Sequence, residues 1–116
     1  MTIMAVDNYC QRLEDFARCL RESYPDDTIV YFADPFRAVQ YINRHPVSIV
    51  FVDLELRPFD AFKFAELAMK FCGSTKVCII TDNIENCEYI AMECDSNIFG
   101  SLARPVSEEG LRQIVV

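Results

Sequence analysis

Several apolar stretches of this chain end in side chains that could do chemistry together. In chain order, the residues at these ends are Asp7, Asn8, Asp53, Thr81, Asp82 and Arg104. If the stretches are strands of one parallel sheet, these groups meet at one edge, since ligands of such sheets bind outside the carboxyl ends of the strands. Two carboxylates there repel one another unless they share a proton or a cation. The spacing predicts a site for Mg²⁺ and a phosphoryl group, which an aspartate could accept as a nucleophile.

The apolar stretches alternate with segments of helical period. The expected strands span residues 3–6, 29–32, 48–52, 77–80 and 98–103. The expected helices follow the strands, with Asp34, Asp60 and Ser107 as N-terminal caps and the fourth helix over roughly residues 84–94. The strands lack alternation of apolar and polar residues, which indicates a parallel sheet buried on both faces. Five such repeats with right-handed crossovers predict a flavodoxin-like, doubly wound α/β sheet of order 2-1-3-4-5, with helices on both faces.

Length and composition restrict the classes of function. At 116 residues the chain has room for one domain, and its 52% hydrophobic content is typical of a globular protein. The net charge of -7 argues against contact of this domain with nucleic acid, which needs a basic face. The apolar stretches are too short for a membrane span, so we expect a cytoplasmic protein whose 6 cysteines are reduced. His45 is the only histidine, which excludes a zinc site of the usual spacing.

The sequence resembles a known family at four places. Val6-Asp7-Asn8, Val52-Asp53-Leu54-Glu55, Ile80-Thr81 and Leu102-Ala103-Arg104-Pro105 resemble the signatures of bacterial response-regulator receiver domains, whose fold is CheY-like. The resemblance covers the whole chain, 1–116, in the family's order and spacing. The stretch 100–109 is most similar to receivers that precede LytTR-type DNA-binding domains. The resemblance implies a two-component signalling domain that is no enzyme beyond a weak autophosphatase activity.

The resemblance also implies a phosphoacceptor and a metal site. Asp53 would accept a phosphoryl group from a sensor histidine kinase. Asp7 would act on Mg²⁺ largely through water, and Glu55 would offer its backbone carbonyl to the metal. Asn8 stands where the family normally has a second acid that binds Mg²⁺ directly. Because Asn8 brings an oxygen but no charge, we expect weak Mg²⁺ binding, which an aspartate at position 8 would tighten.

Four further positions concern the phosphoryl group and the switch. Thr81 matches the family residue that hydrogen-bonds the phosphoryl oxygen and pulls its loop inward. Arg104 stands where the family carries lysine, and its flat fork differs from an ammonium point charge. Asp82 places an acid where the family usually has a small residue, and Ser101 replaces the usual aromatic switch residue. The resemblance therefore implies a signal that passes through Thr81 without an aromatic rotamer change.

The expected partners follow from the same resemblance. We expect an output domain beyond residue 116, of which a LytTR-type DNA-binding domain is the best match, and a sensor histidine kinase as phosphodonor. We also expect pairing of two copies through the fourth helix, the fifth strand and the fifth helix. The expected output is transcriptional regulation.

Two other classes of function remain open at the level of sequence. A degenerate receiver would accept no phosphate and would act only as a docking or dimerisation module. A small α/β enzyme is the remote alternative. An aspartate-nucleophile phosphatase would need a second aspartate where Glu55 stands, and a flavin-binding protein would need a loop rich in Ser, Thr and Gly after the first strand.

Overall fold

The sheet has the predicted order. The computed structural model describes residues 1–93 and 97–114. Five parallel strands hydrogen-bond in the order β2-β1-β3-β4-β5. They are β1 (Thr2–Val6), β2 (Thr28–Phe32), β3 (Ile49–Asp53), β4 (Lys76–Thr81) and β5 (Ile98–Ala103). The strand order reverses between β1 and β3, and a crevice opens at the carboxyl ends of such strands.

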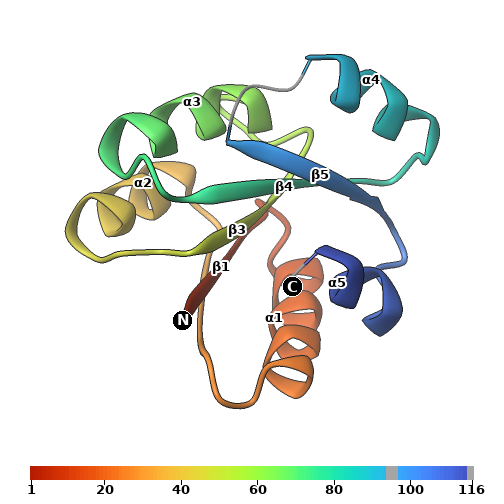
Figure 1. Cartoon of the computed structure of the whole chain (residues 1–116), viewed down its shortest axis with the longest axis horizontal. Coiled ribbons are helices and arrows are strands. Elements are labelled where there is room, and N and C mark those ends of the chain that lie inside the picture. The colour runs from red at the N-terminus through yellow and green to blue at the C-terminus, as the bar shows by residue number, and fades with distance from the viewer. Residues whose placement is uncertain (94–96, 115–116) are drawn as a thin grey trace.

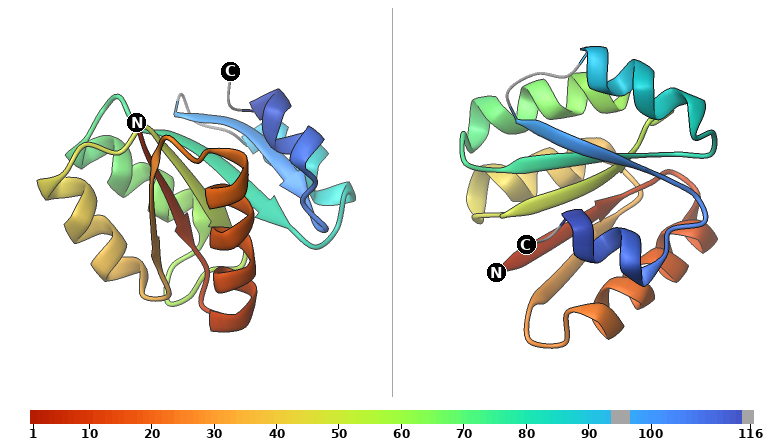
Figure 2. Two further views of the ribbon diagram at one scale, coloured as in Figure 1. Left: turned by 90° about the horizontal axis from the view of Figure 1, so that it is seen from below. Right: turned by 45° about the vertical axis from the view of Figure 1, so that its right-hand side comes forward.

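Helices cover both faces of this sheet (Figure 1). One face carries α1 (Cys10–Ser23) and α5 (Glu108–Ile114). The other face carries α2 (Pro35–Arg44), α3 (Ala61–Phe71) and α4 (Glu85–Glu93). The two further views in Figure 2 show the same division into three layers. The predicted α/β fold class and strand order are confirmed. Within the described ranges, no helix combines the length and the apolar character that a membrane span needs.

Two helices, α2 and α3, begin at residues that the sequence marks as caps. The Asp34 side chain accepts a hydrogen bond from the backbone N–H of Phe36, at 2.9 Å, and proline follows it in the first turn. Asp60 accepts from the backbone N–H of Lys63 at 3.0 Å. The fourth helix is slightly shorter than the predicted range of roughly 84–94, and Cys94 lies outside the described residues, as do residues 115–116.

Two apolar cores hold the layers together. Phe64 of α3 and Leu56 anchor the core on the side of α2, α3 and α4. Phe51 of β3 and Leu20 of α1 anchor the core on the side of α1 and α5, where Phe16 packs edge-on against Phe51 at a ring-centroid distance of 5.4 Å. All five residues of β3 are buried, up to and including Asp53. The sheet therefore holds this carboxylate on a fully packed strand.

Candidate functional site

The parallel sheet brings the predicted strand-end residues to one edge. Asp7 follows β1, Asp53 ends β3, Thr81 ends β4 and Arg104 follows β5. Asp7 and Asp53 are each only 6% exposed, and Thr81 is buried as well. Because β1 pairs directly with β3 in register, both carboxylates lie at the same level of the sheet. The parallel sheet therefore brings these four predicted site residues to the same edge.

Arg104 reaches back over the carboxylates from the end of β5. Its Nη1 lies 2.9 Å from Oδ1 of Asp53 and 3.0 Å from Oδ1 of Asp82. Its Nη2 lies 3.2 Å from Oδ2 of Asp7. The backbone N–H of Arg104 donates to the carbonyl of Thr81 at 2.8 Å, which extends the pairing of the two strands past their ends. Arg104 therefore directs a positive charge at three carboxylates.

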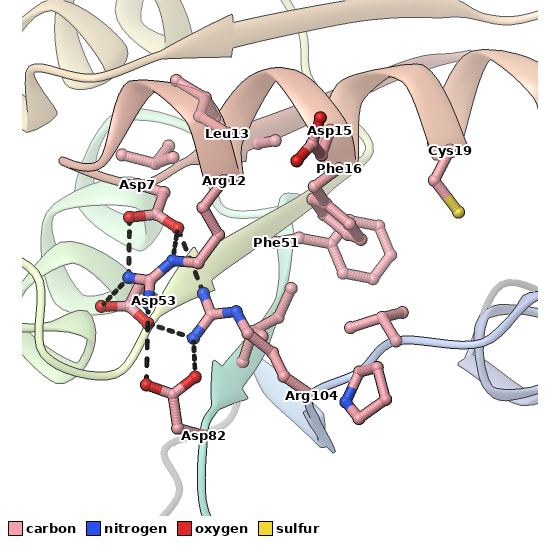
Figure 3. A pocket seen from close by; sticks show the side chains of 15 residues that line it. Asp7, Arg12, Leu13, Asp15, Phe16, Cys19, Phe51, Asp53, Asp82 and Arg104 are labelled. Atoms are coloured by element: carbon pink, nitrogen blue, oxygen red, sulfur yellow. Dashed lines mark hydrogen bonds and ion pairs between the residues drawn. The ribbon is translucent and has the colours of Figure 1, made fainter.

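Arg12 is a second cation at this site, which the sequence patterns did not predict (Figure 3). It stands in the first turn of α1, five positions after Asp7. Its Nε and Nη2 bind the two oxygens of Asp7, at 2.5 and 2.9 Å. Its Nη2 also lies 3.4 Å from Oδ2 of Asp53, and its Nη1 lies 3.6 Å from Oδ2 of Asp82. Two guanidinium groups thus lie among three carboxylates.

The charges of this cluster do not cancel. Three carboxylates face two guanidinium groups, which leaves one negative charge in excess. Burial raises the pKa of the Asp53 carboxyl, and the hydrogen bond from Arg104 opposes that rise only in part. The hydrogen bond to Asp7 is the main cause that raises the pKa of Arg12. Burial thus disfavours the ionised form of Asp53, and the two neighbouring guanidinium groups favour it.

The Asn8 side chain binds the backbone of two neighbouring loops. Its amide nitrogen donates to the backbone carbonyls of Ala33 and Arg57, at 3.1 and 2.9 Å. Its amide oxygen accepts from the backbone N–H of Arg57 at 2.8 Å. One side chain thus ties the loop after β1 to the loops after β2 and β3. Glu55 is exposed in the loop after β3, where the backbone N–H of Leu56 donates to the carbonyl of Asp53 at 3.2 Å.

Replacing Asn8 with aspartate tests this tie between the loops. We expect a loss of about 1–2 kcal/mol in the free energy of unfolding, because the donor to two carbonyls becomes an acceptor that faces them. Urea denaturation of both proteins measures the loss. Asn43→Asp, at an exposed position of α2, is the matched control and should leave stability close to that of the wild type. Equal losses in the two variants would contradict the structural role of Asn8.

The two predicted switch residues lie on β4 and β5. The Thr81 hydroxyl accepts from the amide nitrogen of Asn86 at 2.9 Å and from the backbone N–H of Asn83 at 3.2 Å. These bonds fasten the start of α4 to the end of β4. Ser101 pairs with Ile79 in the middle of β5 and is half-buried. The structure thus brings Thr81 to the edge of the site and places Ser101 on the neighbouring strand.

The donor set at this edge suits Mg²⁺ in type but not in arrangement. Carboxylate oxygens are the ligands that this ion prefers. Each oxygen of Asp7 already accepts a hydrogen bond from a guanidinium, and each oxygen of Asp53 lies within 3.4 Å of one. Among the described residues, no group of three or more His, Cys, Asp or Glu side chains is arranged as a metal site. In this arrangement the residues do not fit the ion, since Arg12 would first have to withdraw.

A hollow of about 450 Å³ adjoins the cluster, between α1 and the segment after β5 (Figure 3). Arg12 and Arg104 lie at its charged end, and Phe16, Phe51 and Val106 form part of its apolar wall. Its size is within the range of small-molecule pockets. The cluster therefore lies at the mouth of an apolar groove rather than on a flat surface.

The comparisons with known proteins concern the fold. No family model matches the sequence, and no curated protein does. The signal receiver domain of a DNA-binding response regulator from Colwellia psychrerythraea is similar with a TM-score of 0.78 and 16% identity, over 99% of this chain and 98% of that one. A two-component transcriptional regulator from Clostridium phytofermentans is similar with a TM-score of 0.80 and 15% identity, over 99% of this chain and 89% of that one.

A chemotaxis protein from Vibrio cholerae is also similar, with a TM-score of 0.79 and 15% identity, over 98% of this chain and 94% of that one. These TM-scores establish a shared fold, whereas identities of 15–16% carry no residue roles. The site lies at the strand ends where an open α/β sheet binds its ligands. The chain therefore has the CheY-like fold of response-regulator receiver domains.

Proposed function

We propose that this chain is a receiver domain that accepts a phosphoryl group on Asp53. The observation that supports it best is the position of Asp53, at the carboxyl end of a buried central strand with guanidinium nitrogens at 2.9 and 3.4 Å. Such cations stabilise the charge of a phosphoryl group through short, charge-assisted hydrogen bonds. The acyl phosphate would form as an Asp53 oxygen bonds to phosphorus while the bond to the donor breaks. The donor would be the phosphohistidine of a sensor kinase.

The proposed switch runs through Thr81. The Thr81 hydroxyl donates to the backbone carbonyl of Asn83 at 3.4 Å, so a phosphoryl oxygen on Asp53 would compete with that carbonyl, just before α4, for the same proton. Movement of Thr81 toward the phosphoryl group would loosen that helix start. Ser101 has no ring to swing. The signal would therefore appear as a population shift of α4, β5 and α5.

The face formed by α4 and β5 is the proposed surface for pairing two copies. Four large apolar side chains on α4, on β5 or directly before α4 are exposed, by 73%, 54%, 79% and 38% respectively: Ile84, Tyr89, Met92 and Phe99. Large apolar side chains left exposed in this region support a proposed interaction surface. We propose that pairing through α4, β5 and α5 controls an attached output domain, of LytTR type and transcriptional in effect.

Mass spectrometry after incubation with acetyl phosphate, with and without Mg²⁺, tests the proposal. We expect the mass of one phosphoryl group to be added to the wild type. Asp53→Asn should gain nothing, because an amide cannot form the acyl phosphate. Asp60→Asn is the matched control, since this exposed acid caps α3 and lies outside the charged cluster, and it should be modified like the wild type. An unchanged wild-type mass after prolonged exposure would refute phosphorylation.

A second candidate is a receiver that is never phosphorylated and acts only by docking. The closed ion-pair cluster favours this candidate, because Asp82 bridges both guanidinium groups from the outside and adds a negative charge where a donor would approach. The same mass measurement separates the two. If the mass stays unchanged while the protein still pairs through the α4 and β5 face, the docking module is the better description.

A further inference from the structure

The guanidinium of Arg12 takes the position that a shared cation would have between Asp7 and Asp53. It binds both oxygens of Asp7 through Nε and Nη2, and Nη2 lies 3.4 Å from Asp53. We propose that Arg12 is a built-in counter-cation, which offsets part of the negative charge of this carboxylate pair and keeps a divalent metal ion out. This inference deepens the proposed function, because it concerns the cation requirement of the same site.

The first argument is that Arg12 is well held in this position. Its planar fork makes a two-point contact with Asp7, a geometry that an ammonium group cannot reproduce. The ring of Tyr9 lies 4.7 Å from the guanidinium carbon, which adds a cation–π contact. The backbone N–H of Tyr9 also donates to Oδ1 of Asp7 at 3.0 Å. The start of α1 thus fixes the guanidinium and its carboxylate together.

The second argument is that a metal ion would find few free ligands. To bind both acids it would have to displace Arg12 from Asp7 and from Asp53. The amide oxygen of Asn8 is already bonded to the backbone N–H of Arg57 at 2.8 Å, so the side chain beside Asp7 offers no ready replacement. Mg²⁺ demands near-ideal geometry and gives up its water reluctantly. When Mg²⁺ and the Arg12 guanidinium compete for the oxygens of Asp7 and Asp53, the guanidinium is therefore favoured, because it is part of the chain.

The third argument is the charge that Arg12 leaves behind when it is removed. With Arg104 as the remaining cation, three carboxylates would have two negative charges in excess. Asp7 and Asp53 are nearly buried and could not spread apart into water. Such a pair is relieved by a shared proton or by a cation from solution, and Mg²⁺ would supply the cation in the titration below. Loss of Arg12 should therefore create the metal site that the wild-type arrangement closes.

Calorimetric titration of Mg²⁺ into wild type, Arg12→Gln and Arg18→Gln tests the inference. Arg12→Gln should bind Mg²⁺ at least about tenfold more tightly than the wild type, or about 1.4 kcal/mol. NMR shifts of the Asp7 and Asp53 amides should locate the ion. Arg18→Gln is the matched control, because Arg18 is exposed on the same helix and pairs with exposed Asp15, at 3.6 Å. Its Mg²⁺ affinity should equal that of the wild type.

A second variant guards against misfolding of the first. Arg12→Lys keeps the charge but loses the fork, so its affinity for Mg²⁺ should lie between those of wild type and Arg12→Gln. Wild-type affinity in both Arg12 variants would overturn the inference. The titration uses no phosphodonor, so it is independent of the mass measurement on Asp53. If tighter Mg²⁺ binding accompanies an Asp53 that is never phosphorylated, the inference stands and the proposed function fails.

Discussion

Replacing Arg104 with alanine is expected to lower the free energy of unfolding by about 3 kcal/mol. Arg104 binds Asp53 at 2.9 Å and Asp7 at 3.2 Å, and the side chains of both acids are only 8% exposed. Its removal leaves two nearly buried carboxylates with Arg12 as their remaining cation. This uncompensated charge is the main cause of the lower free energy of unfolding. The decrease is therefore larger than the contribution of a surface ion pair to stability. Urea denaturation at neutral pH measures it.

Two controls separate charge from packing. Arg112→Ala removes an exposed guanidinium that binds Glu108 at 2.8 Å, and it should cost at most about 0.5 kcal/mol. Adding Asp53→Asn to Arg104→Ala should restore part of the lost stability, because it removes one of the carboxylates left without a partner. A loss in Arg104→Ala no larger than that in Arg112→Ala would mean that the cluster does not depend on this guanidinium.

Much of the fold could be predicted from the sequence because its signals are local. Asp34 and Asp60 stand just before apolar-periodic segments, and each caps a helix through a bond that reaches only two or three residues along the chain. The strands without alternation indicate burial on both faces, which leaves a parallel sheet as the solution. Once the sheet is parallel, the residues at its strand ends must share an edge. The proximity of Asp7, Asp53 and Arg104 could therefore be predicted from the sequence.

The direction of each side chain at that edge could not be predicted. The helical period places Arg12 on the polar face of α1. This period predicts which residues face the core, but it does not predict which polar side chains reach the end of the sheet. The place of Arg12 in the first turn, close after Asp7, was the available signal. Asn8 has the right residue type for a metal ligand, yet its amide binds the backbone of Ala33 and Arg57. Both outcomes depend on rotamers and on loops distant in sequence.

The buried thiol of Cys78 has a consequence at high pH. Cys78 lies in β4 with no exposed surface, and burial raises the pKa of its thiol from 9.0 to about 12. Its folded-state pKa is therefore above that of the unfolded chain. Between these two values the folded protein keeps the proton and the unfolded chain releases it, so stability falls as pH rises through this window. No such contribution acts at neutral pH, where both states hold the proton.

The size of this fall is expected to be large. Each pKa unit corresponds to about 1.4 kcal/mol, so Cys78 should remove up to about 4 kcal/mol between pH 9.0 and about 12. Urea denaturation across this range measures it. Cys78→Ala should start from a lower stability at neutral pH, because it leaves a small void, but should lose less on alkalisation. Cys10→Ala, at an exposed position, should follow the wild type throughout. Parallel curves for wild type and Cys78→Ala would show that the thiol stays protonated in both states or ionises in both, contrary to its burial in β4.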